Sequence, residues 1–257
     1  MLDQKDKAGN FRRLHVAGDP LVLFNIWDAG SAKAVTAAGA KAIATGSWSV
    51  AAANSHADGE QVPIDLVIGN LARITGAVDL PVTVDLESGY AQASEAVAAT
   101  IERAIAAGAI GCNLEDSFPH DGSLRAMSDQ VVRIRSARRG ADGSGIAFFI
   151  NARTDVLFQP GQAHDEAAIA TVLERARAYA DAGADGLFVP GLVDEGLMTR
   201  LAAASPLPLN VMVAAKTPAL QRLASAGVAR VSHGPGPYRR AMKMLEEAAR
   251  AASSRLA

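Results

Sequence analysis

Cysteine is almost absent from this chain, whose 257 residues include only Cys112. A single cysteine cannot form a disulfide within the chain, so the sequence favours a reducing, cytoplasmic setting. Cys112 lies inside an apolar run, and we expect it to pack in the core rather than to take part in catalysis.

Long hydrophobic runs are missing too. No stretch approaches the roughly 20 apolar residues of a membrane-spanning helix. Residues 1–14 are charged and polar, without the apolar core of a secretory signal. The net charge of -2 gives no electrostatic reason to expect nucleic acid or an anionic membrane as a partner. We therefore expect a small-molecule partner.

Linkers and low-complexity segments are absent, and the composition does not shift along the chain. Hydrophobic residues make up 49% of the sequence, enough for a sizeable core. The length matches the roughly 250 residues typical of a single barrel of alternating strands and helices. We expect one domain spanning residues 1–257.

What the chain does contain is a pattern that occurs four times. An alanine-rich helical stretch ends in Ala-Gly and is followed by an apolar, β-rich run. Glycine suits the left-handed backbone that ends a helix, so each repeat predicts a helix followed by a strand. The four pairs are Ala38-Gly39, Ala107-Gly108, Ala182-Gly183 and Ala226-Gly227.

Eight short apolar runs alternate with helical patterns. This alternation predicts the α/β class and closes most simply into a single-domain (β/α)8 TIM barrel. We expect an extra helix before Leu21, covering the barrel bottom, and a final helix over residues 238–257. The predicted strands are 21–26, 42–47, 81–87, 111–115, 147–153, 186–189, 207–213 and 229–232, and the helical patterns include 64–77, 94–107, 128–139, 166–182 and 218–226.

Three carboxylates stand where predicted strands end: Asp85, Glu87 and Glu115. In such a barrel the active site lies at the carboxyl rim of the strands. Asp85 and Glu87 are two residues apart and point the same way, and Glu115 can join them from the next strand. Three acids without an evident cationic partner indicate a hard cation such as Mg2+. The alternative is that each acid caps the helix that follows it.

Arg153 ends the fifth predicted strand. Its guanidinium could form paired bonds with the carboxylate of a substrate. Alternatively, it forms an ion pair with Asp155 or Glu115.

Other strand ends offer further candidates for binding a substrate. Gly46 and Ser47 supply backbone N–H groups and a hydroxyl that suit a carboxylate or an oxyanion. Asn210 and His233 end two later strands, where they either contact a substrate or are satisfied by other partners at the rim.

Two of these strand-end motifs, DLESGY at residues 85–90 and LED at residues 114–116, resemble those of the isocitrate lyase and phosphoenolpyruvate mutase superfamily. The likeness extends over nearly the whole barrel and indicates a member similar to 2-methylisocitrate lyase. The shared chemistry of that superfamily passes through an enolate of pyruvate or a close relative. Further matching segments are 25–29, 45–50, Asp58, 152–155, 182–185 and 188–191.

The resemblance implies a bound Mg2+, with Mn2+ as an alternative. It implies that Asp85 binds the metal most directly, while Asp58, Glu87 and Glu115 act largely through water molecules. Glu87 stands where the superfamily usually has aspartate, so the metal geometry is expected to shift.

The resemblance also implies a small 2-oxo acid substrate. Its carboxylate would be held by Gly46, Ser47 and Arg153, with Trp48 beside them. Members of the superfamily commonly assemble with a late helix exchanged between subunits, which implies a homo-oligomer, a tetramer or a dimer.

The loop after the LED motif departs from the superfamily. Isocitrate and methylisocitrate lyases carry there a cysteine placed for proton transfer, whereas residues 117–125 read SFPHDGSLR. Mutase and hydrolase members use a lysine and a longer loop. His120 and Tyr90 are therefore the candidates for moving a proton, and with Glu115 and Arg153 they form the predicted catalytic set.

The sequence thus predicts a Mg2+-dependent carbon–carbon lyase acting on a small 2-oxo acid or a 2-hydroxy acid adduct through a pyruvate-type enolate. Decarboxylation of an oxaloacetate-type acid is nearly as well supported, because it needs least from the altered loop. Hydrolysis of phosphonopyruvate is a weaker alternative. From another class of function, a non-catalytic 2-oxo acid binding protein would also retain the metal site.

Overall fold

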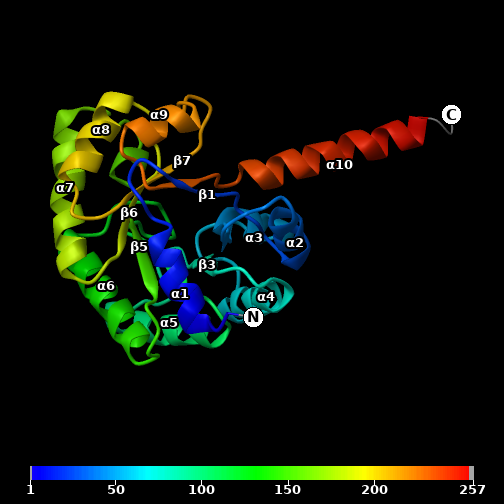
Figure 1. Cartoon of the computed structure of the whole chain (residues 1–257), viewed down its shortest axis with the longest axis horizontal. Coiled ribbons are helices and arrows are strands. Elements are labelled where there is room, and N and C mark those ends of the chain that lie inside the picture. Colours follow the sequence, from blue (N-terminus) through cyan, green and yellow to red (C-terminus); the bar gives the residue numbers. More distant parts are fainter. Residues whose placement is uncertain (1, 255–257) are drawn as a thin grey trace.

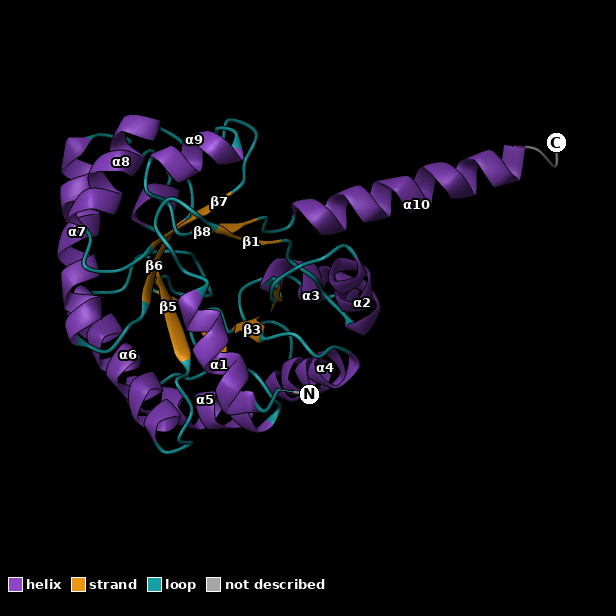
Figure 2. Ribbon diagram, viewed as in Figure 1, coloured by secondary structure: helices purple, strands orange, loops and turns teal. Residues whose placement is uncertain are grey.

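The computed structural model describes residues 2–254 and shows a barrel of eight parallel strands surrounded by helices (Figures 1 and 2). Each strand pairs with its neighbour in the chain from β2 to β8, and β8 pairs with β1. The remaining seam, between β1 and β2, is joined by one parallel bridge between Ile26 and Thr45. The predicted TIM barrel is therefore confirmed, with one loosely joined seam.

All eight strands lie within the predicted ranges, but several are shorter. In β1, β2, β3 and β7 the last residues of the predicted run leave the ladder at the rim, whereas β5 and β8 begin later than predicted. After β2, for example, Gly46 caps a helix that begins at Ser47 instead of continuing the strand. The strands are β1 (Leu21–Leu23), β2 (Ile43–Ala44), β3 (Val82–Asp85), β4 (Gly111–Glu115), β5 (Phe149–Arg153), β6 (Gly186–Val189), β7 (Leu209–Met212) and β8 (Arg230–Ser232).

The predicted helices are present with small shifts of their ends. One start differs for a clear reason: helix α9 begins at Leu220 rather than at 218, because the Thr217 hydroxyl bonds Ala214 N and Met212 O instead of capping it. Residues 255–257 of the predicted last helix lie outside the described part. The helices are α1 (Gln4–Arg13), α2 (Ala29–Ala37), α3 (Ser47–Ala53), α4 (Ile64–Ala77), α5 (Val97–Ala106), α6 (Met127–Asp142), α7 (Glu166–Asp181), α8 (Glu195–Ala204), α9 (Leu220–Ser225) and α10 (Gly236–Ser254), with short 3-10 turns η1 (Ser94–Ala96) and η2 (Val156–Phe158).

The four Ala-Gly pairs end helices as predicted. Their glycines all have left-handed backbone angles, with φ of 87°, 94°, 101° and 83° at Gly39, Gly108, Gly183 and Gly227. Each turn sends the chain directly into the next strand, so these glycines set the alternation of the fold.

Helix α1 closes the amino-terminal end of the barrel, as the sequence predicts. Phe11 is fully buried and meets the ring of Phe149, at the start of β5, at 5.5 Å. The side chain of Gln4 donates to the carbonyls of Ile105 and Ala109, at 2.9 Å each. Burial of this face leaves the opposite rim for chemistry.

Helix α10 projects away from the barrel rather than folding back over it (Figure 1). Its first turn packs near the rim, where Tyr238 meets the rings of Trp27 and Trp48. Farther along, Met244 and Leu245 are 68% and 61% exposed. Within residues 2–254, no helix is both long and apolar enough to cross a membrane.

Candidate active site

The ends of β3, β4 and β5 bring charged side chains to one rim. Adjacent strands pair in register, with Asp85 opposite Asn113 and Glu115 opposite Arg153. Because the strands are parallel, their carboxyl ends emerge on the same side. The structure thus brings together Asp85, Glu115 and Arg153, as the sequence predicts.

Arg153 is held by two carboxylates. Its Nη1 lies 2.7 Å from Glu115, while Nε and Nη2 donate to the two oxygens of Asp155 at 2.6 and 2.9 Å. Glu115 therefore does have a cationic partner, which the sequence did not make evident. Burial raises the pKa of Glu115 to about 8, with Arg153 opposing the shift. Both ion pairs that were the alternative for Arg153 are present.

Asp85 and Asp58 form a pair of acids across the rim. Asp85 accepts a hydrogen bond from Ser47 N at 3.2 Å, and its own N–H donates to the Thr45 hydroxyl at 2.9 Å. Burial, and then the charge of Asp85, raise the pKa of Asp58 above its ordinary value. Neither acid has an ion pair within residues 2–254.

Glu87 is bound within the chain. Its Oε2 accepts from Gly59 N and Glu60 N at 2.8 and 2.7 Å, and its Oε1 accepts from the Tyr90 hydroxyl at 2.8 Å. A carboxylate has about four acceptor positions, so three are occupied. Burial, and then the charge of Asp58, raise the pKa of Glu87 to about 7. Burial and Glu87 likewise raise the pKa of Tyr90.

The rim can be tested for its fit to a divalent cation. Among the described residues, no three His, Cys, Asp or Glu side chains converge to hold a metal ion by themselves. Mg2+, however, keeps several waters and is usually bound through one or two carboxylates. Burial and the charge of Asp85 raise the pKa of Asp58, so the two carboxylates repel one another when both are ionised without a cation between them. The residues fit a hydrated Mg2+ held by few direct ligands.

The loop at residues 117–126 is a short hairpin. Ser117 and Leu124 form an antiparallel bridge, and Arg125 stacks 4.0 Å from the ring of Phe118. His120 lies at its tip, 69% exposed and 3.3 Å from Asp121. The predicted proton-transfer residue therefore faces solvent, whereas Tyr90 lies beside Glu87.

The remaining predicted substrate residues have partners of their own. The Asn210 side chain donates to Ser232 Oγ at 3.0 Å and is buried inside the barrel. The His233 ring packs on Phe24, with 5.0 Å between ring centres. Arg239 stacks on Trp48 at 4.5 Å, beside the start of α10.

Sequence reasoning missed a supporting layer behind Arg153. The buried Asp116 accepts from Asp155 N, and its other oxygen accepts from Arg175 and from the Tyr179 hydroxyl, at 2.9 and 2.7 Å. Ser117 Oγ donates to Asp155 at 2.7 Å. Ser117 is two residues after Glu115, the same spacing that singled out Asp85 and Glu87, whereas nothing local in the sequence points to α7.

Comparison with known proteins places the chain in a family. The model of the family described as phosphoenolpyruvate phosphomutase matches residues 11–253. The chain belongs to the phosphoenolpyruvate phosphomutase family. This agrees with the resemblance carried by the two strand-end motifs, because the family lies within the superfamily of mutases and lyases.

Two relatives are similar to this chain over nearly its whole length. The crystal structure of a supposed phosphonomutase from Burkholderia cenocepacia J2315 is 57% identical, covers 97% of this chain and 100% of its own, and superposes with a TM-score of 0.95. The uncharacterized protein Rv1998c of Mycobacterium tuberculosis H37Rv is 34% identical over 95% of this chain and 89% of its own length.

Other relatives have named activities. The 2-methylisocitrate lyase of Salmonella typhimurium is 28% identical over 77% of this chain and 67% of its own. The oxaloacetate decarboxylase of Chromohalobacter salexigens is 29% identical over 93% and 83%. A phosphonopyruvate hydrolase solved with oxalate and Mg2+ shares the fold, at 22% identity over 94% and 84% and a TM-score of 0.81. The chain is thus related to a lyase and a decarboxylase that act on small acids, and it shares its fold with a hydrolase.

Proposed function

We propose that this protein is a Mg2+-dependent carbon–carbon lyase acting on a small 2-oxo acid or 2-hydroxy acid. The observation that carries the proposal is the arrangement of charge at the rim. Among residues 2–254 Asp58 and Asp85 form no ion pair, and the guanidinium of Arg153 lies close enough to interact with both charges. A site with an acidic side for a metal and a cationic side for a carboxylate suits a chelating 2-oxo acid.

The likeness to relatives supports the choice of metal and substrate. A phosphonopyruvate hydrolase of the same fold binds Mg2+ and oxalate, a small dicarboxylate shaped like a chelated 2-oxo acid. In this chain Asp85 would hold the metal directly. Asp58, and the acceptor positions of Glu87 and Glu115 that remain free, would reach the metal through water molecules. Bound Mg2+ would act as a Lewis acid on the oxygen where charge develops.

The side chains account for the rest of the chemistry. Arg153 uses three of its five N–H donors on Glu115 and Asp155, which leaves two for the substrate carboxylate. The backbone N–H groups of Gly46 and Ser47, expected to hold the substrate carboxylate, instead donate to Ile26 O and Asp85, at 3.1 and 3.2 Å, and Trp48 follows them in the chain. In a 2-oxo acid the bond between C3 and its substituent breaks, and its electron pair becomes the enolate of the product. In a 2-hydroxy acid the hydroxyl loses its proton to a base and the C2–C3 bond breaks, which leaves a 2-oxo acid and puts the electron pair on C3 as the enolate of the second product. That enolate then takes a proton at C3.

Proton transfer is where the two forms of the reaction differ. Cleavage of a 2-hydroxy acid adduct requires a base for the hydroxyl proton. Tyr90, hydrogen-bonded to Glu87, is the buried candidate, and His120 is the exposed one. Asn210 and His233 are candidates for contact with the C3 substituent.

Decarboxylation of an oxaloacetate-type acid is the second candidate. It is favoured by the position of His120, because loss of CO2 leaves an enolate that solvent can protonate without a positioned side chain. Hydrolysis of a carbon–phosphorus bond is less well supported, because no lysine stands in the 117–126 loop. Retention of 2-oxo acid binding without turnover would instead indicate a binding protein.

The test is a substrate panel. We expect the purified protein with Mg2+ to release pyruvate or glyoxylate from at least one of oxaloacetate, 2-methylisocitrate, isocitrate and phosphonopyruvate. EDTA should abolish the reaction, as should Asp85→Asn, whereas Asp65→Asn on the exposed face of α4 should have no effect. Wild-type rates for Asp85→Asn in EDTA would refute the metal-dependent lyase. His120→Ala should slow adduct cleavage but not decarboxylation.

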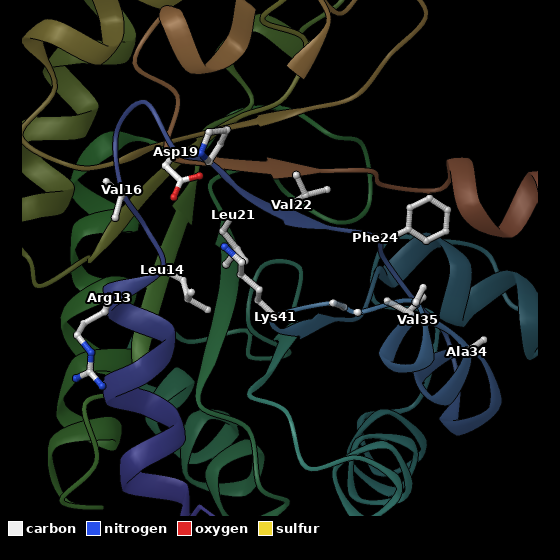
Figure 3. Close-up of a pocket in the computed structure, with 14 residues that line it drawn as sticks. Arg13, Leu14, Val16, Asp19, Leu21, Val22, Phe24, Ala34, Val35 and Lys41 are labelled. Carbon is white, nitrogen blue, oxygen red and sulfur yellow. The ribbon is translucent and has the colours of Figure 1, made fainter. Parts of the chain in front are cut away.

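The structure also supports assembly into a homo-oligomer, a tetramer or a dimer. A groove of about 660 Å3 runs along the outer face of β1, between the end of α1 and helix α2 (Figure 3). Leu14, Val22, Phe24 and Val35 are among its apolar lining residues. We propose that α10 of a second copy fills it, because the same helix of this copy projects away with apolar residues exposed. We also propose that the protein acts in the cytoplasm, the setting that its single cysteine favours.

A further inference from the structure

Backbone strain is concentrated at one place in the molecule. In residues 2–254 four non-glycine residues have left-handed backbone angles: Ser55, Glu60, Glu87 and Tyr90, with φ of 59°, 57°, 50° and 52°. Two of them lie in the loop between α3 and α4, residues 54–63, and two lie in the loop after β3, residues 86–93. Such angles persist only where the surrounding structure enforces them.

The enforcing contacts are reciprocal. The Glu87 carboxylate accepts from the backbone N–H groups of Gly59 and Glu60. In return, Glu60 Oε1 accepts from the Ser88 hydroxyl and from Tyr90 N, at 2.7 Å each. Each loop therefore uses one acid to bind the backbone of the other.

Two further segments support this pair of loops. A Cβ at Gly59 would lie 2.5 Å from the carbonyl oxygen of Pro119, so the 117–126 hairpin packs directly on the 54–63 loop. From α6, the fully buried Arg133 donates to the carbonyls of Ser88 and Ala91. Burial lowers the pKa of Arg133, and among the carboxylates the charge of Glu60 opposes this shift most. Arg133 and the hairpin thus pack against the same pair of loops that the hydrogen bonds of Glu60 join directly.

The position of Asp58 depends on this contact. Asp58 lies two residues before Glu60 in the same loop, and its backbone continues into the two N–H groups that Glu87 binds. We propose that Glu60 is a positioning residue that fixes the 54–63 loop on the 86–93 loop and so holds Asp58 beside Asp85. The contact between the two loops does not depend on what the protein does. The effect on metal binding rests on the function proposed above.

The experiment compares Glu60→Ala with Glu60→Gln and with Glu102→Ala, an exposed acid on α5. Gln keeps an oxygen that accepts both hydrogen bonds and loses only the charge. In metal-free protein we expect Glu60→Ala to accelerate amide hydrogen exchange at residues 58–60 and 88–90 by about 10-fold or more, since two hydrogen bonds are lost. Glu60→Gln and Glu102→Ala should stay within about 3-fold of wild type at the same amides.

Calorimetry with Mg2+ and Mn2+ then tests the effect on Asp58. We expect the dissociation constant to rise about 10-fold in Glu60→Ala and to recover in Glu60→Gln, in line with the loss of two hydrogen bonds. Unchanged exchange in Glu60→Ala would overturn the fixing of the loops. Faster exchange with unchanged metal affinity would overturn the positioning of Asp58. If wild-type protein bound neither ion, the proposed function would fail, while the exchange data would still decide the role of Glu60 in the loops.

Discussion

Arg153 is held in place by a series of contacts from several elements. Glu115 and Asp155 fix its guanidinium, and Asp116 in turn fixes Asp155 through the backbone N–H. Arg175, from α7, completes this chain of contacts. A guanidinium fixed by two carboxylates keeps two N–H donors for a further partner, which suits recognition of a carboxylate.

At this scale we predict that Arg153→Lys lowers kcat/KM by about 10- to 100-fold. An ammonium has three donors, and the two carboxylates would occupy them, so the substrate loses charge-assisted bonds of about 1.5–3 kcal/mol. The measurement is steady-state kinetics on the substrate that the panel identifies. Arg103→Lys, in the exposed pair with Asp65, is the matched control and should keep the wild-type value. An unaltered kcat/KM in Arg153→Lys would exclude a role in holding the substrate.

Much of the site could be predicted residue by residue because it follows from strand ends. Asp85, Glu115 and Arg153 end consecutive strands, and parallel pairing alone brings them together. Glu60 and Arg175 could not be predicted this way, because their partners lie 28 to 59 residues away and no periodic pattern links them.

Among the elements, strands and helices were predictable for a different reason. The Ala-Gly pairs mark each transition locally, and the structure has all four glycines in the expected conformation. The ends of elements were less predictable. The residue types of a run do not show where its strand ends, because hydrogen bonds decide where the ladder stops. After β2, the Thr45 hydroxyl accepts from Asp85 N, and Gly46 caps helix α3.

Helix α1 carries a pH-sensitive residue at its end. His15 stacks on the Phe149 ring at 4.1 Å and its Nδ1 lies 2.9 Å from the carbonyl of Phe11. Burial, followed by the charges of Arg230 and Arg12, lowers the pKa of His15 to about 3. In the folded protein His15 is therefore neutral, whereas in the unfolded chain it gains a proton below about pH 6.5.

We predict that His15→Phe reduces the acid sensitivity of stability. Between pH 6.5 and pH 3 the unfolded wild-type chain binds one more proton than the folded protein at His15, so this contribution falls as pH falls, by about 1.4 kcal/mol per pH unit. Relative to wild type, the variant should gain about 2 kcal/mol in free energy of unfolding between pH 6.5 and 5.0. Urea unfolding at the two pH values measures it. A difference that does not change with pH would contradict the prediction.

At the scale of the whole molecule, the barrel lacks a cover on one side. The helix that follows β8 does not return to the sheet, and the groove beside β1 is apolar (Figures 1 and 3). Exchange of α10 between two copies would bury the apolar residues of α10 and fill the groove of each copy, because the two contacts of a two-fold dimer are identical.

We predict that Leu245→Asp weakens this assembly. Burial of one leucine contributes about 1.5–3 kcal/mol, and a two-fold exchange contains two, so the dissociation constant should rise about 100-fold or more. Sedimentation velocity across a dilution series is the measurement. Lys243→Gln, at a 77% exposed site on the same helix, should leave the oligomer unchanged. A wild-type protein that sediments as a monomer at all concentrations would refute the exchange.

The short hairpin at residues 117–126 has a stereochemical consequence. With His120 directed to solvent, the proton donor predicted in this loop is not held over an enolate formed at the rim. If solvent supplies the proton, it arrives from both faces. A substrate whose C3 carries two different groups would then yield a racemic product, and the same reaction in heavy water would place deuterium at C3 without preference for either configuration.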